Sequence, residues 1–302
     1  MGWNDIQGNP EQSSGGKQLR PLLTLLSATA MGGIVENALP LASAIELIHT
    51  FSLIHDDVMD NSAMRRGRPS VWNVWGVNQA INAGDGAYGL SFQLLADADY
   101  SLDIRRVLRA EAMLGKACVD TVQGQMLDIS FEDRETVGVE DYTTMTSLKT
   151  GPLIGLAMAG GALLAGARFE TVNALDHTGR TLGVAFQIQD DILGIWGNPE
   201  KTGKANVDDL VQKKKSLPVL WALENVEDDQ LHKLYQEPAP LSLETAKTIY
   251  DILTTNEVRR VVEEEADQHY QTVVRDIREY YPDNEARAEM LNIVDFIVNR
   301  NF

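Results

Sequence analysis

Apolar side chains recur at three- and four-residue intervals over long stretches of the 302-residue chain, the pattern of helices that bury one face. Gly or Pro stands at many of the junctions between these stretches. Convincing two-residue alternation, which would indicate strands, is lacking. The helices predicted in this way span roughly residues 19–33, 40–63, 77–97, 102–131, 140–148, 153–166, 170–196, 212–225, 241–254, 256–281 and 284–300. The pattern therefore predicts an all-α fold.

The organisation of the chain indicates a single domain. No Pro/Ser-rich linker or internal repeat divides it, and 44% hydrophobic residues are enough for a buried core. No stretch of about 18 uninterrupted apolar residues exists, and the first residues carry no charged-then-apolar signal peptide. We therefore expect one domain over residues 1–302, in a soluble cytoplasmic protein without a transmembrane segment.

The net charge of −18 bears on the choice of partner. It argues against nucleic acid, whose phosphates would be repelled. A smaller phosphorylated ligand is still compatible, because surface charges are screened beyond about 8–10 Å at physiological salt. Local cations then decide what binds.

Two acidic motifs end apolar helical stretches. Asp56, Asp57 and Asp60 occupy positions i, i+1 and i+4, which lie on one side of a helix, and Asp190-Asp191 follow about 130 residues later. Each motif alone is more often a charged helix face than a catalytic site. Oxygen-only ligands of this kind suit Mg2+, which usually keeps several waters and is completed by substrate phosphates.

Cations suited to a polyanion surround these acids, and the order of the motifs resembles a known family. The motifs are GGKQLRP, ELIHTFSLIHDDVMD, RRGRPSVW, NAGDGAY, GQMLD, LKTGPL, FQIQDDILG and TGKANVDDLVQKKKSLP. They closely resemble the polyprenyl synthetase family, the trans-type isoprenyl diphosphate synthases, over residues 15 to about 220. Within that family the chain is most similar to the geranylgeranyl diphosphate synthases.

The resemblance implies a fold and a reaction. The fold would be the isoprenoid synthase fold, a single-domain bundle of about ten or more helices around a central hydrophobic cavity. The reaction would be head-to-tail prenyl transfer, in which an allylic diphosphate ionises and the double bond of isopentenyl diphosphate attacks the carbocation. Three Mg2+ ions with substrate bound, and a homodimer, are also implied.

The metal ligands implied first are Asp56, Asp60 and Asp190. Asp57 and Asp191 belong to the same motifs and either support these ligands or, like Asp128, form an ion pair or a solvated helix face. The two motifs would face each other across the diphosphate. Gln187, one turn before Asp191, would reach the allylic diphosphate or the developing cation.

The other site residues are implied by the motifs that match. Arg65, Lys149 and Lys204 resemble the residues that grip the allylic diphosphate. The isopentenyl diphosphate site would be formed by Gly16, Lys17, Arg20, His49 and Arg66. For His49 the alternative is a satisfied core histidine.

Two segments carry further predictions. Pro152 fits the first turn of a helix, so the backbone before it should break, and the freed carbonyls with the Thr150 hydroxyl would stabilise a carbocation. Residues 196–215 form a Gly- and Lys-rich loop, which is either a solvated loop or a lid that closes Lys204 and Lys214 over phosphates.

The chain departs from the family pattern at three places. Gly194 stands one turn after Asp190 where the second acidic motif usually has a third Asp, and Trp72 stands where many relatives have His. Only fourteen residues precede Gly15, which suggests that an N-terminal helix is missing. None of these departures removes a metal ligand implied first. The short N-terminus bears more on the predicted dimer interface than on the chemistry.

Three alternatives to a twenty-carbon synthase stay open. A class I terpene cyclase would need the acidic motifs but no isopentenyl diphosphate site, so Lys17, Arg20, His49 and Arg66 favour the transferase. A farnesyl or longer-chain synthase would share all of these motifs. A non-catalytic partner subunit would not need intact acidic motifs.

Product length is predicted from the helix that carries Asp56, because the growing tail would run along it. Phe51 lies five residues before Asp56, about 7.5 Å along the axis, whereas the small Ser52 leaves the upper pocket open. Tyr88 and Phe92, on a neighbouring helix, are additional or alternative stops. An aromatic at this fifth position resembles the synthases that stop at geranylgeranyl diphosphate; the alternative is that Phe51 is ordinary core.

Overall fold

The structure, a computed structural model, describes residues 18–97, 103–134, 136–197 and 207–298. Within these residues it contains fourteen helices and two short strands, so the predicted all-α fold is confirmed. The chain forms two compact units. Unit 1 extends to Cys118 and adds Leu156–Asp176 and Tyr281–Arg287, and unit 2 takes Val119–Gly155, His177–Tyr280 and the residues from Ala288 on.

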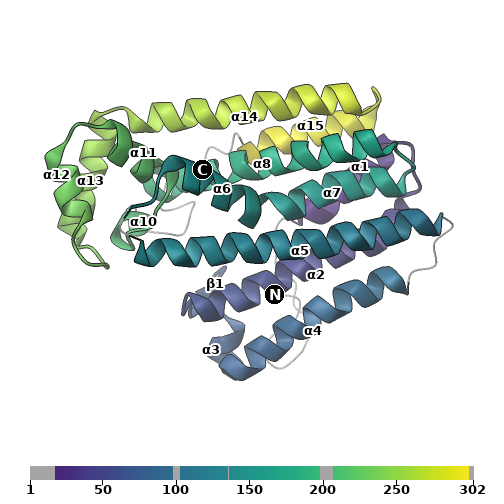
Figure 1. Cartoon of the computed structure of the whole chain (residues 1–302), viewed down its shortest axis with the longest axis horizontal. Helices are drawn as coiled ribbons and strands as arrows, with labels where there is room; N and C mark the ends of the chain where they lie inside the picture. The colour runs from purple at the N-terminus through teal and green to yellow at the C-terminus, as the bar shows by residue number, and fades with distance from the viewer. Residues whose placement is uncertain (1–17, 98–102, 135, 198–206, 299–302) are drawn as a thin grey trace. The chain divides into compact units, whose positions relative to one another are not determined.

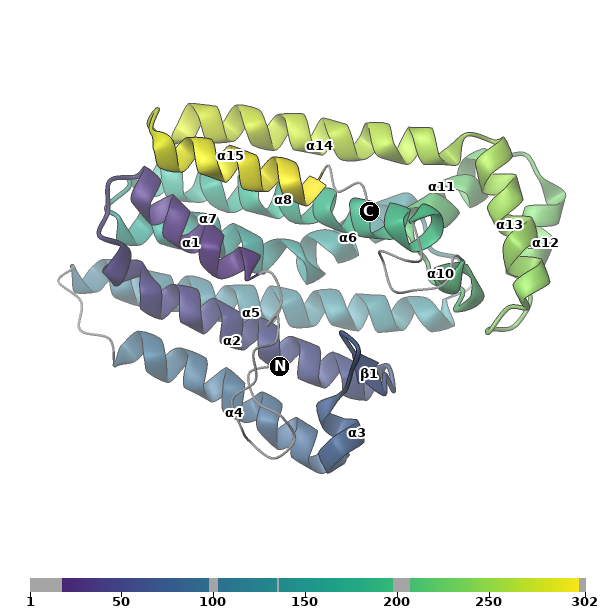
Figure 2. The ribbon, with the colours of Figure 1, turned by 180° about the vertical axis from the view of Figure 1, so that it is seen from behind.

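Unit 1 is built on one long helix. The elements that lie wholly in it are α1 (Leu19–Ala30), α2 (Val35–Met59), β1 (Met64–Arg65), β2 (Arg68–Pro69), α3 (Val71–Trp75) and α4 (Val77–Ala96). α2 packs against α1 and α4, and α2 and α4 lie side by side in both views (Figures 1 and 2). Burial of Leu41, Ile45 and Ile48 on α2 therefore fixes the helix that ends in the first acidic motif.

A chain of buried hydrogen bonds joins distant segments of unit 1. The Tyr281 hydroxyl donates to Ser27 Oγ at 2.8 Å, and Ser27 Oγ donates to the Met158 carbonyl. Asn284 Nδ2 donates to the Ala30 carbonyl at 2.8 Å. Because a buried polar group without a partner is costly, these bonds fasten residues 281–287 to α1.

Among the described residues, six helices lie wholly in unit 2. They are α6 (Val139–Lys149), α10 (Asp208–Val211), α11 (Leu217–Asn225), α12 (Asp229–Tyr235), α13 (Leu243–Thr255) and α14 (Val258–Tyr280). Its core packs Tyr142 and Met145 of α6 with Ile188 and Ile192, and with Leu220 of α11. α12 and α13 lie side by side in both views (Figures 1 and 2).

Four helices have one segment in each unit: α5 (Ile104–Asp133), α7 (Gly151–Leu164), α8 (Phe169–Trp196) and α15 (Glu285–Val298). α6 and α7 meet at a 45° bend around Thr150, so the predicted break before Pro152 is present as a bend. Thr150 itself keeps helical dihedrals, and its amide donates to the Thr146 carbonyl at 3.0 Å.

Two helices start five residues away from the predicted position for physical reasons. α2 begins at Val35 and runs through Pro40, because a proline removes only its own bond to the preceding turn and Ala38 and Leu41 are buried on either side. α11 begins at Leu217, after the predicted start at 212, because Lys213 has a φ of 56° and cannot lie in a helix.

The short hairpin β1–β2 was not predicted. Its register pairs Met64 with Pro69 and Arg65 with Arg68, and the turn residues Arg66 and Gly67 have φ values of 53° and 75°. Two positive φ values in a two-residue loop are the mark of a type I′ turn. Two-residue strands are too short to give an alternating pattern, which is why the sequence does not reveal them.

By length and composition α2 is a candidate membrane span, as is the bent pair α6–α7. The most apolar 18-residue window of α2 has a mean hydropathy of 1.3, and 44% of that window is buried in the protein. The core helix of a soluble protein passes the same test, so this is weak evidence. The absence of a transmembrane segment stays a prediction.

Candidate functional site

The first acidic motif lies at the C-terminal end of α2 in unit 1. Asp60 is the residue that caps the helix, and its amide donates to the Asp56 carbonyl at 2.9 Å, so the two are one turn apart on one face as predicted. Asp56 is half-buried and Asp60 is exposed. Both carboxylates can therefore meet a ligand from solvent.

Asp57 has a different environment from its neighbours. Its side chain is only 4% exposed, and Oδ1 accepts a hydrogen bond from Arg65 Nε at 2.7 Å. Arg65 Nη2 also lies 4.0 Å from Asp56 Oδ2. The hairpin β1–β2 thus returns Arg65 to the acidic motif, where Asp57 anchors it.

A cationic group of three arginines lies around the half-buried His49 in unit 1. Burial lowers the pKa of His49 well below its usual value, and the charges of Arg20, Arg66 and Arg65 lower it further. Glu46, three residues earlier on α2, has its pKa raised by burial against the lowering effect of Arg20 and Arg66. The predicted isopentenyl diphosphate residues Arg20, His49 and Arg66 are therefore brought together.

Sequence reasoning missed Glu46. Glu46 could have been found from the sequence, because it is a carboxylate among the apolar residues of a predicted core helix and lies one turn before His49. Three other predicted binding residues, Gly16, Lys17 and Lys204, lie outside the residues that the structure describes.

The aromatic residues predicted to limit product length form one row in unit 1. Ring centroids of Phe51 and Tyr88 are 5.4 Å apart, and those of Tyr88 and Phe92 are 5.2 Å apart. Phe51 also meets His55 edge-on at 4.8 Å. At about 100° per residue, Ser52 lies roughly 40° around the helix from Asp56 and Phe51 roughly 140°. Ser52 therefore shares the face of Asp56, and Phe51 faces α4.

In unit 2 the bend between α6 and α7 brings three predicted residues together. Thr150 Oγ1 donates to Gln187 Oε1 at 3.2 Å, and Lys149 Nζ forms an ion pair with Asp128. Thr150 is buried, whereas the Lys149 and Asp128 side chains are 28% and 36% exposed. Of the two readings of Asp128, the ion pair is the one the structure shows.

The second acidic motif repeats the division found in the first. Asp190 is half-buried, whereas Asp191 is fully buried. Asp191 accepts hydrogen bonds from Lys214 Nζ at 3.0 Å, Gln187 Nε2 at 3.2 Å and the Leu217 amide at 3.1 Å. These bonds fix the Asp191 carboxylate within the protein.

Lys214, predicted to close over phosphates, forms ion pairs with two carboxylates in this structure, and its phosphate-binding role stays a prediction. Its Nζ is 3.0 Å from Asp191 and 3.7 Å from Asp209 Oδ2. The Asp191 charge raises the pKa of Lys214 although the ammonium group is partly desolvated, and Asp209 raises it further. Lys213 and Lys215 are also engaged, the first with the Glu237 carbonyl at 2.7 Å and the second with carbonyls near the end of α5.

Tyr142 is a second residue that sequence reasoning missed. It is 2% exposed and lies in the core beneath the second acidic motif, where burial and then the Asp191 charge raise the pKa of its phenol well above the usual value. Tyr142 comes from α6, far from Asp191 in sequence, and no local pattern links the two.

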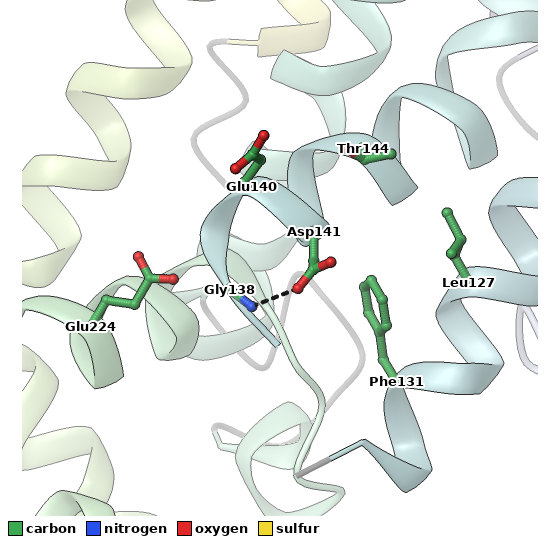
Figure 3. Close-up of a pocket in the computed structure, with 7 residues that line it drawn as sticks. All are labelled: Leu127, Phe131, Gly138, Glu140, Asp141, Thr144 and Glu224. Atoms are coloured by element: carbon green, nitrogen blue, oxygen red, sulfur yellow. Dashed lines mark hydrogen bonds between the residues drawn. The ribbon is translucent and has the colours of Figure 1, made fainter. Parts of the chain in front are cut away.

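A separate pocket of about 490 Å3 opens in unit 2 (Figure 3). Glu140, Asp141 and Glu224 line it with Thr144 and Phe131. As Figure 3 shows, Asp141 accepts a hydrogen bond from the Gly138 amide. Glu224 accepts one from the Val139 amide at 2.8 Å. These carboxylates cap the first turn of α6, and their negative charge makes the pocket unsuitable for a diphosphate.

The oxygen donors fit Mg2+ with a phosphate ligand. Among the described residues, no three His, Cys, Asp or Glu side chains are grouped closely enough to enclose an ion by themselves. Mg2+ usually binds one or two carboxylates, several waters and substrate phosphates, so exposed or half-buried pairs such as Asp56 and Asp60 suit it. A site of this kind takes up its metal together with the substrate.

Comparison with known proteins identifies relatives that are all named as prenyl diphosphate synthases. The chain is 41% identical over 245 residues to a geranylgeranyl diphosphate synthase of Mycobacterium tuberculosis, covering 80% of the chain and 69% of that relative. It is 42% identical over 223 residues to a (2E,6E)-farnesyl diphosphate synthase of Mycobacterium bovis, covering 74% and 61%. A geranylfarnesyl diphosphate synthase of Aeropyrum pernix is 39% identical over 292 residues, covering 95% and 91%.

A solved structure and a family profile agree with these relatives. The crystal structure of a polyprenyl synthetase from Streptomyces coelicolor A3(2) superposes with a TM-score of 0.89 at 37% identity, covering 98% of this chain and 89% of that one. The profile of the polyprenyl synthetase family matches residues 9–253, which include both acidic motifs. The chain belongs to the polyprenyl synthetase family of prenyltransferases.

Proposed function

We propose that the chain, as one polyprenyl synthetase domain over residues 1–302, catalyses head-to-tail condensation of isopentenyl diphosphate with an allylic diphosphate in the presence of Mg2+. The allylic C–O bond breaks and its electron pair leaves with the diphosphate. The double bond of isopentenyl diphosphate then attacks the allylic carbon, and loss of a proton restores a double bond. The product is five carbons longer than the primer.

The observation that carries this proposal is the cationic group around His49. A histidine kept neutral by burial and by Arg20, Arg66 and Arg65 marks a region of strong positive potential inside an acidic protein. A terpene cyclase needs no second diphosphate site, so this group favours the transferase. The remaining binding residues are proposed from the sequence alone. They are Arg65 and Lys204 for the allylic diphosphate, and Gly16 and Lys17, with Arg20, for isopentenyl diphosphate.

Residues of unit 2 would stabilise the charge that develops on the allylic carbon. The Thr150 hydroxyl and the Gln187 amide are joined by a hydrogen bond and therefore have fixed orientations. Lys149 would hold the allylic diphosphate, with Asp128 fixing the position of its ammonium group. A preorganised polar group of this kind stabilises a cation without having to reorient during the reaction.

Asp56, Asp60 and Asp190 would hold the metal, and bound Mg2+, three ions with substrate, would neutralise the leaving diphosphate. The buried carboxylates Asp57 and Asp191 would keep their motifs in place from inside the protein, through Arg65 and through Lys214. Neither would need to touch the ion to matter for its binding.

We propose geranylgeranyl diphosphate, with twenty carbons, as the product. The names of the relatives span farnesyl, geranylgeranyl and geranylfarnesyl diphosphate synthases, so family membership alone leaves the length open. The row formed by Phe51, Tyr88 and Phe92 supports a stop at this depth. Phe51→Ala should lengthen the products without abolishing ionisation, as measured by chromatography of the dephosphorylated products. Unchanged length, or a fifteen-carbon wild-type product, would overturn this assignment.

We also propose a cytoplasmic homodimer. On the unit 2 segment of α5, the apolar side chains of Val119, Val122, Met126 and Ile129 recur at three- and four-residue spacing and are all exposed. Such a stripe on a helix is suited to pairing with a second copy. Met126→Glu should convert a wild-type dimer to a monomer in sedimentation velocity; a monomeric wild type would contradict the proposal.

The experiment that tests the reaction uses the purified protein with Mg2+, labelled isopentenyl diphosphate and allylic primers of several lengths. Incorporation of label into longer prenyl diphosphates supports the transferase. Release of a hydrocarbon from the primer alone would indicate a cyclase, and no reaction with any primer would indicate a non-catalytic subunit.

A further inference from the structure

Gly194 lies one helical turn after Asp190 on α8, and a carboxylate from another segment occupies the space beside it. A Cβ atom built on Gly194 would lie 2.0 Å from Asp209 Oδ2 and 2.8 Å from Asp209 Cγ, far inside van der Waals contact. A side chain at 194 would therefore displace the Asp209 carboxylate. Glycine at this position is the residue that lets the carboxylate reach α8.

The position of that carboxylate relative to Asp190 follows from helix geometry. Residues i and i+4 share a face, with Cβ atoms roughly 5–6 Å apart. Asp209 Oδ2 lies where residue 194 would begin its side chain, so it lies on the Asp190 face about one turn further along α8. Two carboxylates at this separation can act on one ion, directly or through its waters.

Asp209 is held in this position from both ends. Its side chain is 11% exposed, its Oδ2 lies 3.7 Å from Lys214 Nζ, and its carbonyl accepts a hydrogen bond from the Lys214 amide at 2.9 Å. Lys214 Nζ is closer to Asp191, at 3.0 Å. Lys214 thereby links the carboxylate of Asp191 on α8 to the carboxylate of Asp209, which reaches α8 from α10.

We propose that Asp209 supplies the carboxylate that Gly194 lacks in the second acidic motif, as a positioning residue for the metal–diphosphate that Asp190 binds, and that Gly194 and Asp209 are a matched pair. The inference rests on the proposed function. Each acidic motif would then have two carboxylates about one helical turn apart. Asp56 and Asp60 come from one helix, whereas Asp190 and Asp209 come from two segments.

The first test removes the charge while keeping the volume. Asp209→Asn should raise the Mg2+ concentration for half-maximal activity by about 10- to 100-fold, the usual effect of losing a residue that supports a metal ligand. Binding of inorganic diphosphate with Mg2+, measured by calorimetry, should weaken similarly. The Michaelis constant for the allylic primer should rise more than that for isopentenyl diphosphate. Asp229→Asn, the same charge change on the exposed first turn of α12, should alter none of these quantities.

The second test exchanges the pair. Asp209→Gly should have the same defect as Asp209→Asn, and the double variant Gly194→Asp/Asp209→Gly should recover most of the Mg2+ dependence and diphosphate binding. A double variant no better than Asp209→Gly would overturn the pairing. An Asp209→Asn protein that melts at a lower temperature but keeps the wild-type Mg2+ dependence would show a purely structural role and overturn the inference.

These outcomes separate the inference from the proposed function. If the wild-type protein elongates no primer, the proposed function fails, and binding of Mg2+ with inorganic diphosphate still decides the role of Asp209. If the wild-type protein is active and Asp209→Asn binds Mg2+ and diphosphate normally, the inference alone fails.

Discussion

The two acidic motifs lie in different units, yet each places its second aspartate inside the protein and its first where a ligand can reach it. In unit 1 the buried Asp57 is held by Arg65, eight residues later, whereas in unit 2 the buried Asp191 is held by Lys214, 23 residues later. In both, a cation returns along the chain to the inner carboxylate. The two aspartates of each pair therefore have different roles: the buried one fixes the motif within the protein, and the other is available to the ligand.

The two motifs differ in how local their construction is. The first is complete within α2 and a tight hairpin, so its geometry follows from short-range structure. The second depends on α10, on the Lys213–Lys215 segment and on the start of α11. The second motif should therefore be more sensitive to changes outside its own helix.

The largest effect is expected from the outer carboxylates. Asp56→Ala and Asp190→Ala should each lower turnover by about 10²–10³ with the fold retained, because each removes one electrostatic element at the developing charge. Single-turnover rates and circular dichroism would measure this. If the two carboxylates act in one step, the double variant should lose far less than the product of the single effects. Full activity in excess EDTA would contradict the metal role of both.

A second prediction is that residues of unit 1 and of unit 2 affect the binding of different substrates. Arg20→Ala and Arg66→Asn should raise the Michaelis constant for isopentenyl diphosphate about tenfold or more, the loss of a charged hydrogen bond, with little effect on the primer. Asn is chosen at 66 because it tolerates the positive φ of the turn. Lys149→Ala in unit 2 should show the reverse preference.

Arg68→Ala is the matched control for that prediction, since it removes the same charge from the same hairpin. It should affect both Michaelis constants weakly. Equal effects of Arg20→Ala on both substrates would mean that the two diphosphate sites have been assigned wrongly.

The inner carboxylates should affect stability in proportion to the bonds they accept. Asp191→Asn should cost about 2–3 kcal/mol of unfolding free energy, because Asp191 accepts three hydrogen bonds, and Asp57→Asn about 1 kcal/mol, because its partner Arg65 is one-third exposed. Urea denaturation would measure both. The opposite ranking would refute the view that unit 2 depends more on its inner aspartate.

The smallest effect concerns pH. Because the pKa of His49 lies well below its usual value in the folded protein, the unfolded chain takes up a proton first as pH falls below about 6.5. Stability should therefore fall between pH 6.5 and the lower folded-state pKa, at most about 1.4 kcal/mol per pH unit, and His49→Gln should reduce that slope.

The sequence predicted what is periodic or local. The long helices, the one-turn spacing of Asp56 and Asp60, and the bend before Pro152 all follow from nearest-turn geometry. The helices α3, α10 and α12 were missed because they are at most seven residues long and span too few turns to show a period.

The contacts that complete each motif were less accessible to prediction. The ion pair of Lys214 with Asp191 could not be predicted, because it depends on α10 and on the turn at Lys213, which bring Lys214 back to α8. Glu46, Tyr142 and Asp209 are defined by what surrounds them in space. A glycine at 194 signalled a missing carboxylate, but only coordinates reveal which residue fills the space.

The hydrogen bonds from Tyr281 to Ser27 and from Ser27 to Met158 bear on the biosynthesis of the protein. At roughly 5–20 residues per second, the ribosome releases residue 281 many seconds after α1 has emerged. Ser27 is therefore without its tyrosine partner for most of translation. Unit 1 can complete its interior only when the chain is nearly finished, so a nascent protein stalled before residue 281 should be recognised by chaperones and proteases as incompletely folded.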